Sequence, residues 1–110
     1  MKVTAHAAVR WLERIKGMDL REVQSEMRNL GLNWKAPGDL LQHLWKTREI
    51  SVFDISAEIL TPFVCSAIRA GVATIRLGGA TLIVRNQVVV SVLSPHMKTS
   101  YGASRGEARA

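Results

Sequence analysis

Apolar residues recur with a helical period through the first two-thirds of the chain and with a strand period near its end. Within residues 5–16, apolar side chains fall at i, i+3, i+4 and i+7, which is the spacing of one buried helix face. Thr4 precedes this segment as an N-cap, and Gly17 follows it as a residue that can close a helix. The pattern predicts a first helix whose buried stripe consists of Ala8, Trp11, Leu12 and Ile15.

Two further amphipathic segments follow, each with residues that favour a helix start. Asp19 and Glu22 have the spacing of a capping box, and the helix that they begin is expected to end near Gly31. Asp39 comes after a turn at residues 36–38 and is expected to cap a third helix. The side chains predicted to point inward are Leu20, Val23, Met27 and Leu30 in the second helix, and Leu40, Leu41, Leu44 and Trp45 in the third.

Residues 50–71 contain one ambiguous segment and one clear helix start. Residues 50–55 alternate enough to form a short strand, but Asp54 or Ser56 can also begin a helical turn through Leu60, so both interpretations stay open. Thr61 followed by Pro62 is typical of a helix N-terminus. That last helix is expected to end at Gly71 and to bury Phe63, Val64, Ala67 and Ile68.

After Gly71 the apolar period shortens to two, which indicates β-strands at residues 73–77, 80–84 and 88–93. Gly78-Gly79 suits a two-residue primed turn, and Asn86-Gln87 suits a second reversal. We therefore predict an α+β fold, in which N-terminal helices pack on one face of a C-terminal three-stranded antiparallel β-meander. The last strand is rich in valine and is expected to be central and buried.

The composition fits one globular domain. The chain has 110 residues, of which 47% are hydrophobic and 22% are charged. We expect this domain to span residues 1–95, and residues 96–110, which lack apolar periodicity, to form a flexible basic tail. Because a core of this size gives only marginal stability, a homodimer is a reasonable expectation.

Several classes of protein are disfavoured by what the sequence lacks. The N-terminus has no apolar signal-peptide core, no stretch approaches the ~18 apolar residues of a membrane span, and Cys65 has no cysteine partner. The three histidines have no partners at metal-ligand spacing, and there is no phosphate-binding glycine loop and no serine-hydrolase elbow. We therefore expect a soluble, cytoplasmic protein that has no membrane contact, no metal and no cofactor.

The net charge of +6 favours phosphate-rich partners such as RNA. Arg76 and Arg85 in the predicted strands, together with Lys98 in the predicted tail, are the candidate nucleic-acid contacts. The two arginines can equally serve to keep a sheet edge soluble. The tryptophans are expected to be core or interface anchors rather than base-stacking platforms, and they are Trp11, Trp34 and Trp45.

A second face of the first predicted helix carries residues suited to acid–base chemistry on a phosphodiester. His6, Arg10 and Glu13 fall at i, i+4 and i+7. Histidine can move a proton near neutral pH, arginine can hold a phosphate, and glutamate can orient the histidine. RNA cleavage needs little more, because the 2′-hydroxyl of the substrate is the nucleophile. The alternative is a solvated helix face whose charged residues form ordinary surface ion pairs.

Two segments of the chain carry a resemblance to a known group of proteins. They are residues 3–14, VTAHAAVRWLER, with a His-x-x-x-Arg helix start, and residues 79–93, GATLIVRNQVVVSVL, a hairpin that ends in valines. Together they resemble small phage-encoded and toxin-like proteins of the RelE-like and colicin-D-like ribonuclease fold. The resemblance implies a metal-independent ribonuclease, or a relative that kept the fold and lost the activity, and His6 and Arg10 are the positions that carry over. The chain departs from such toxins in its longer helical middle, at residues 28–50, and in the lack of an obvious catalytic residue after the last strand.

Two hypotheses of function follow. The first is a small RNA-directed protein, in its most specific form a metal-independent endoribonuclease of toxin or phage type. In it His6 is the acid/base, Arg10 with Arg76 or Arg85 holds the phosphate, and Glu13 orients His6. The second is a non-catalytic phage or accessory protein that binds a partner protein, as a homodimer for example, or that binds nucleic acid through its charge.

Overall fold

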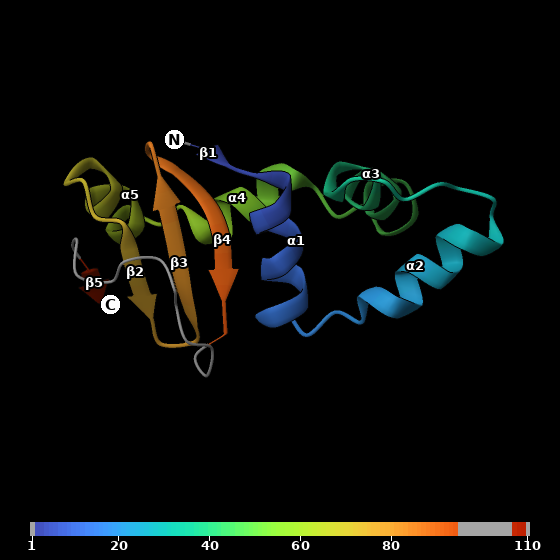
Figure 1. The fold of residues 1–110 in the computed structure, drawn as a ribbon, viewed down its shortest axis with the longest axis horizontal. Coiled ribbons are helices and arrows are strands. Elements are labelled where there is room, and N and C mark those ends of the chain that lie inside the picture. Colours follow the sequence, from blue (N-terminus) through green and yellow to red (C-terminus); the bar gives the residue numbers. More distant parts are fainter. Residues whose placement is uncertain (1, 95–106, 110) are drawn as a thin grey trace.

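The computed structural model describes residues 2–94 and 107–109, and within these residues it contains five helices and five strands (Figure 1). The predicted α+β class is confirmed, with the helices preceding the main strands. The helices are α1 (Ala5–Arg14), α2 (Leu20–Asn29), α3 (Pro37–Arg48), α4 (Val52–Ile59) and α5 (Pro62–Arg69). The strands are β1 (Lys2–Val3), β2 (Thr74–Leu77), β3 (Ala80–Arg85), β4 (Val88–Leu93) and β5 (Glu107–Arg109).

The sheet is mixed and has the strand order β1-β4-β3-β2-β5. The predicted meander forms its centre, because β3 pairs antiparallel with both β2 and β4. The prediction that the sheet has only three antiparallel strands is wrong, since β1 pairs parallel with β4 and β5 pairs parallel with β2. Both added strands are too short to show an apolar alternation in the sequence. The rest of the predicted tail, including Lys98, lies outside the described residues.

The two reversals of the meander have different backbone conformations. Asn86 and Gln87 have φ values of 50° and 63°, as a two-residue primed turn requires. Gly78 and Gly79 also join paired strands, but neither has a positive φ. The prediction of a primed turn at the two glycines is therefore wrong, and the strained left-handed positions are at residues that have side chains.

Helix α1 lies between the sheet and the other N-terminal helices (Figure 1). Thr4 caps it as predicted, with Oγ1 accepting a hydrogen bond from the Ala7 amide at 3.1 Å. The helix packs against β4, α3 and α4. Its buried side chains are Ala7, Ala8, Val9, Trp11 and Leu12, while Ile15 of the predicted stripe is partly buried.

Both ends of α1 are also hydrogen-bonded to β4. At the start, the Thr4 amide donates to the carbonyl of Val89 at 3.0 Å. At the end, Nη1 of Arg14 donates to the carbonyl of Val92 at 2.6 Å. The position of α1 on the sheet is therefore held by polar contacts as well as by apolar packing.

Helix α3 buries three of the four side chains predicted to point inward. Leu40, Leu41 and Leu44 are buried as expected, but Trp45 is 57% exposed. His43 takes the inward position instead, because its Nε2 lies 2.8 Å from Oε1 of Glu26 on α2 and so has a polar partner at a buried site. Asp39 is also not the N-cap: Ala36 is the cap, Pro37 is the first helical residue, and Asp39 is the third.

Two more predicted inward side chains are exposed. Leu30 follows the last residue of α2 and is 63% exposed, and Phe63 in the first turn of α5 is 40% exposed. Of the two interpretations of residues 50–60, the helix is correct and the strand is wrong, but the helix starts at Val52 rather than at Asp54 or Ser56. Ser51 caps it by accepting a hydrogen bond from the Phe53 amide at 3.1 Å. None of the described helices is long and apolar enough to cross a membrane.

Gln87→Gly should stabilise the fold. A side chain at a left-handed φ costs roughly 1–2 kcal/mol, and glycine avoids this cost. Because glycine loses more conformational entropy on folding, part of the gain is offset, and the net stabilisation should be about 0.5–1 kcal/mol. Asn86→Gly is the matched comparison and should gain less, because asparagine tolerates this conformation better than glutamine. Urea unfolding measures both differences, and a loss of stability in Gln87→Gly would contradict the turn geometry.

Candidate functional site

The polar face of α1 opens onto a cleft of about 350 Å³. One wall is α1, and the opposite wall is formed by α2 and the segment that leads into α3. All three predicted catalytic residues lie in this cleft. Its lining residues are His6, Val9, Arg10, Glu13, Leu20, Gln24, Trp34, Lys35, Ala36 and Pro37.

Arg10 and Glu13 form an ion pair inside the cleft, with Nη1 of Arg10 2.7 Å from Oε1 of Glu13. Nε of Arg14 lies 3.8 Å from the same oxygen. Glu13 therefore contacts arginines, and no hydrogen bond between Glu13 and His6 occurs in this part of the described structure. A guanidinium has five N–H groups, so Arg10 keeps donors for a further anion while it is paired.

His6 is the titratable group whose environment is most unusual in the cleft. Burial lowers the pKa of His6 from its ordinary value of 6.5, and the guanidinium groups of Arg10 and Arg14 lower this pKa further. A lowered pKa favours the neutral imidazole at pH 7, and this form can accept a proton. A neutral histidine between cationic side chains is suited to act as a general base on an anionic substrate.

The wall opposite α1 contributes an aromatic ring and a second cation. Trp34 lines the cleft and is 42% exposed, and the next residue, Lys35, lines it as well. The carboxylate of Asp39 accepts hydrogen bonds from the backbone amides of Lys35 and Ala36, each at 3.1 Å. This carboxylate holds the segment against the start of α3 and thereby places Trp34 and Lys35 beside the cleft.

Three cleft residues with polar or aromatic side chains were not among the predicted site residues, namely Gln24, Trp34 and Lys35. Trp34 and Lys35 lie in the aperiodic segment between α2 and α3, where no hydrophobic pattern assigns a direction to a side chain. An aromatic residue next to a basic one in a connecting segment is the only sequence signal for them. Of the three tryptophans, Trp11 alone is a core anchor, and its Nε1 donates to Oε2 of Glu58 at 2.8 Å.

The predicted nucleic-acid contacts lie elsewhere. Arg76 is on β2 and Arg85 is on β3, and neither is among the residues that line the cleft. Arg85 lines a separate hollow with Asn86 and Gln87. Lys98 lies outside the described residues. The basic residues that line the cleft together with His6 are Arg10 and Lys35.

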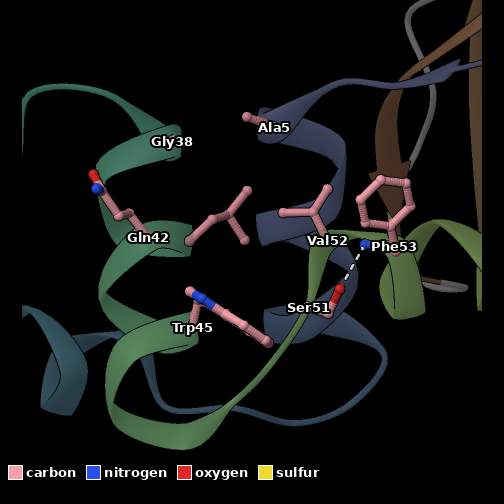
Figure 2. A pocket seen from close by; sticks show the side chains of 8 residues that line it. Ala5, Gly38, Gln42, Trp45, Ser51, Val52 and Phe53 are labelled. Atoms are coloured by element: carbon pink, nitrogen blue, oxygen red, sulfur yellow. Dashed lines mark hydrogen bonds between the residues drawn. The ribbon is translucent and has the colours of Figure 1, made fainter.

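A further hollow lies beside α3 (Figure 2). It is an apolar groove of about 560 Å³, and Figure 2 shows α3 forming one wall and α1 with α4 forming the other. Trp45 is 57% exposed and Phe53 is 87% exposed, although both are large apolar side chains. The residues that line this apolar groove are Ala5, Gly38, Leu41, Gln42, Trp45, Ser51, Val52 and Phe53.

Comparisons with known proteins identify no relative, so the functional interpretation rests on the geometry of the cleft and the apolar groove. No family model, no curated protein and no solved structure matches the chain. Over residues 2–94, for which side chains are described, no three His, Cys, Asp or Glu side chains are grouped so that they could hold a metal ion.

The lowered pKa of His6 predicts how stability depends on pH. Above pH 6.5 the imidazole is neutral in both the folded and the unfolded chain, and it contributes nothing. As the pH falls below 6.5, the unfolded chain takes up the proton more readily, so the free energy of unfolding decreases until the pH passes the folded pKa. His6→Gln removes this effect.

Urea unfolding at about pH 7.5 and about pH 5 checks this expectation. Wild type should lose stability relative to His6→Gln on going to the lower pH. A wild type that instead gains stability relative to the variant in acid would show that the pKa of His6 is raised rather than lowered.

Proposed function

We propose that this protein is RNA-directed, and that it binds an RNA phosphodiester in the cleft beside α1 and cleaves it without a metal ion. The observation that carries the proposal is that His6, Arg10 and Lys35 line one cleft, in which the pKa of His6 is lowered. The net charge of +6 supports it, because a basic protein attracts polyanions over long range. The resemblance of residues 3–14 and 79–93 to toxin-like ribonucleases points the same way.

The proposed chemistry needs only groups that the cleft and the substrate supply. His6 takes the proton of the ribose 2′-hydroxyl, and the 2′-oxygen forms a bond to the neighbouring phosphorus. The bond from phosphorus to the 5′-oxygen breaks, and that oxygen takes a proton from solvent. The products are a 2′,3′-cyclic phosphate and a 5′-hydroxyl end.

The cations of the cleft support this step in two ways. Arg10 and Lys35 bind the phosphate through charge-assisted hydrogen bonds and stabilise the charge that develops on its oxygens. Arg10, together with Arg14, also lowers the pKa of His6, which favours the unprotonated form that the base needs. Glu13 positions Arg10 through their 2.7 Å ion pair.

Cleavage of a structured and an unstructured RNA in EDTA tests the proposal. The wild type should cleave in EDTA, and His6→Gln should reduce the rate roughly 10²- to 10⁴-fold, as the loss of a general base does. The reaction should also slow in acid as His6 takes up a proton. Arg10→Gln should reduce cleavage as well, whereas Arg21→Gln on the exposed start of α2 is the matched control and should not.

If His6→Gln cleaves RNA in EDTA at the wild-type rate, His6 is not the general base. If the wild type neither cleaves nor binds RNA, the proposed function is wrong. Thermal unfolding of each variant separates a loss of chemistry from a loss of fold.

The apolar groove favours a second candidate function, which is self-association. We propose a second copy of the chain as its occupant, because a two-fold interface needs one patch that offers both a hollow and a projection. The groove between α3 and the pair α1 and α4 is the hollow, and Phe53, at 87% exposed, is the projection at its edge. None of the lining residues is charged, so the net charge of the chain is not concentrated where two copies would meet.

Phe53→Ser should convert a dimer into a monomer. The substitution removes the apolar side chain that would fill the partner's groove. Sedimentation equilibrium measures the molecular mass of the wild type and of the variant. Phe63→Ser, at a 40% exposed position on α5, is the matched control and should remain dimeric. A wild type that stays monomeric at high micromolar concentration would rule out self-association through the apolar groove.

A further inference from the structure

We infer that the cleft accepts an unpaired nucleotide and that Trp34 is the platform on which its base stacks. This inference rests on the proposed function and adds the class of RNA that the site takes. It starts from a tryptophan that the core does not use. Trp34 lines the cleft at 42% exposure, although the chain buries Trp11 almost completely.

The ring and a cation reach the same cleft from adjacent positions in the chain. Lys35 follows Trp34, and His6 and Arg10 face them from α1 across the cleft. Proteins that bind single-stranded nucleic acid combine these two features, a cationic track for the backbone and an aromatic face for a base. Gln24 of α2 lines the same cleft and carries an amide that can hydrogen-bond to the edge of a base.

The segment that carries Trp34 is fixed on both sides. Before it, the Leu32 amide donates to the carbonyl of Met27 at 2.9 Å, which ties the segment to the end of α2. After it, the amides of Lys35 and Ala36 donate to Asp39 on α3. Trp34 therefore lies between two anchored points of the backbone, which reduces the conformational entropy that the segment loses when a base stacks on the ring.

The size of the cleft and the geometry of RNA indicate an unpaired nucleotide. A volume of about 350 Å³ is near the lower end of the range for ligand pockets, about 300–1,000 Å³, and suits one nucleotide. In an A-form duplex both faces of an internal base are covered by its neighbours, so an aromatic side chain can reach a base only where the strand is unstacked. Loops, bulges and single strands satisfy this condition.

The experiment measures binding rather than cleavage, on the full chain with His6→Gln to prevent turnover. Fluorescence anisotropy compares a short unstructured RNA, the same RNA annealed to its complement, and a DNA of the same sequence. The single-stranded RNA should bind roughly tenfold or more tightly than the duplex, and Trp34→Ala should abolish that preference and weaken binding about tenfold. Trp34→Phe should restore part of the affinity, since a smaller ring still stacks.

Phe63→Ala is the control, because it removes a similarly exposed aromatic side chain on α5, outside the cleft. Equal affinity for single-stranded RNA and duplex, or full affinity in Trp34→Ala, overturns the inference even if the wild type cleaves RNA. Tighter binding of the DNA overturns the assignment of the ligand as RNA. Conversely, a chain that cleaves nothing but binds single-stranded RNA through Trp34 supports the inference while the proposed catalysis fails.

Discussion

The packing of α1 against β4, α3 and α4 is the constraint on which the rest of the structure depends. Two alanines on its buried face, Ala7 and Ala8, have no exposed surface, and such small side chains allow neighbouring elements to approach closely. Hydrogen bonds from Thr4 and Arg14 to the carbonyls of β4 hold the two ends of the helix. Because these contacts fix the rotation of α1 about its axis, they also fix where its polar face points. The cleft lies along that polar face.

The electrostatics of the cleft follow from the same helix. Arg14 donates to the carbonyl of Val92 on the sheet and also contributes, with Arg10 and with burial, to the lowered pKa of His6. One side chain therefore links the attachment of α1 to the protonation state of the candidate base. A protonated His6 would add to the attraction for phosphate but would have no site for the proton of a 2′-hydroxyl. The neutral form, surrounded by cations that bind the anion, can serve both binding and proton transfer.

The sequence predicted those features that depend on local periodicity and capping. The N-caps Thr4 and Thr61 follow from local residue types, and the structure confirms them. The predicted bounds of the three meander strands agree with the structure to within one residue, and three of the four residues in the predicted stripe of α1 are buried. The His6, Arg10 and Glu13 face was predicted in the same way, and the structure places all three in one cleft. Features set by tertiary contacts were not predictable. The burial of His43 depends on Glu26 seventeen residues earlier, and this contact turns Trp45 outward. Trp34 and Lys35 are directed into the cleft by hydrogen bonds between their segment and Asp39, which no periodic pattern encodes.

The cleft and the apolar groove are lined by neighbouring residues: Ala5 of α1 lines the groove and His6 lines the cleft, and Gly38 and Pro37 of α3 do the same. Self-association through the apolar groove would therefore occur close to the proposed RNA site. The central claim is that an RNA phosphodiester lies beside His6. NMR titration of the His6 imidazole, with and without a dinucleotide that lacks the 2′-hydroxyl next to its phosphate, tests this claim most directly. The account predicts that the pKa of His6 is below 6.5 in the free protein and rises when the dinucleotide binds, because the phosphate stabilises the imidazolium, while the His43 resonances stay unchanged. A His6 titration curve that is unchanged by an excess of the dinucleotide would contradict it.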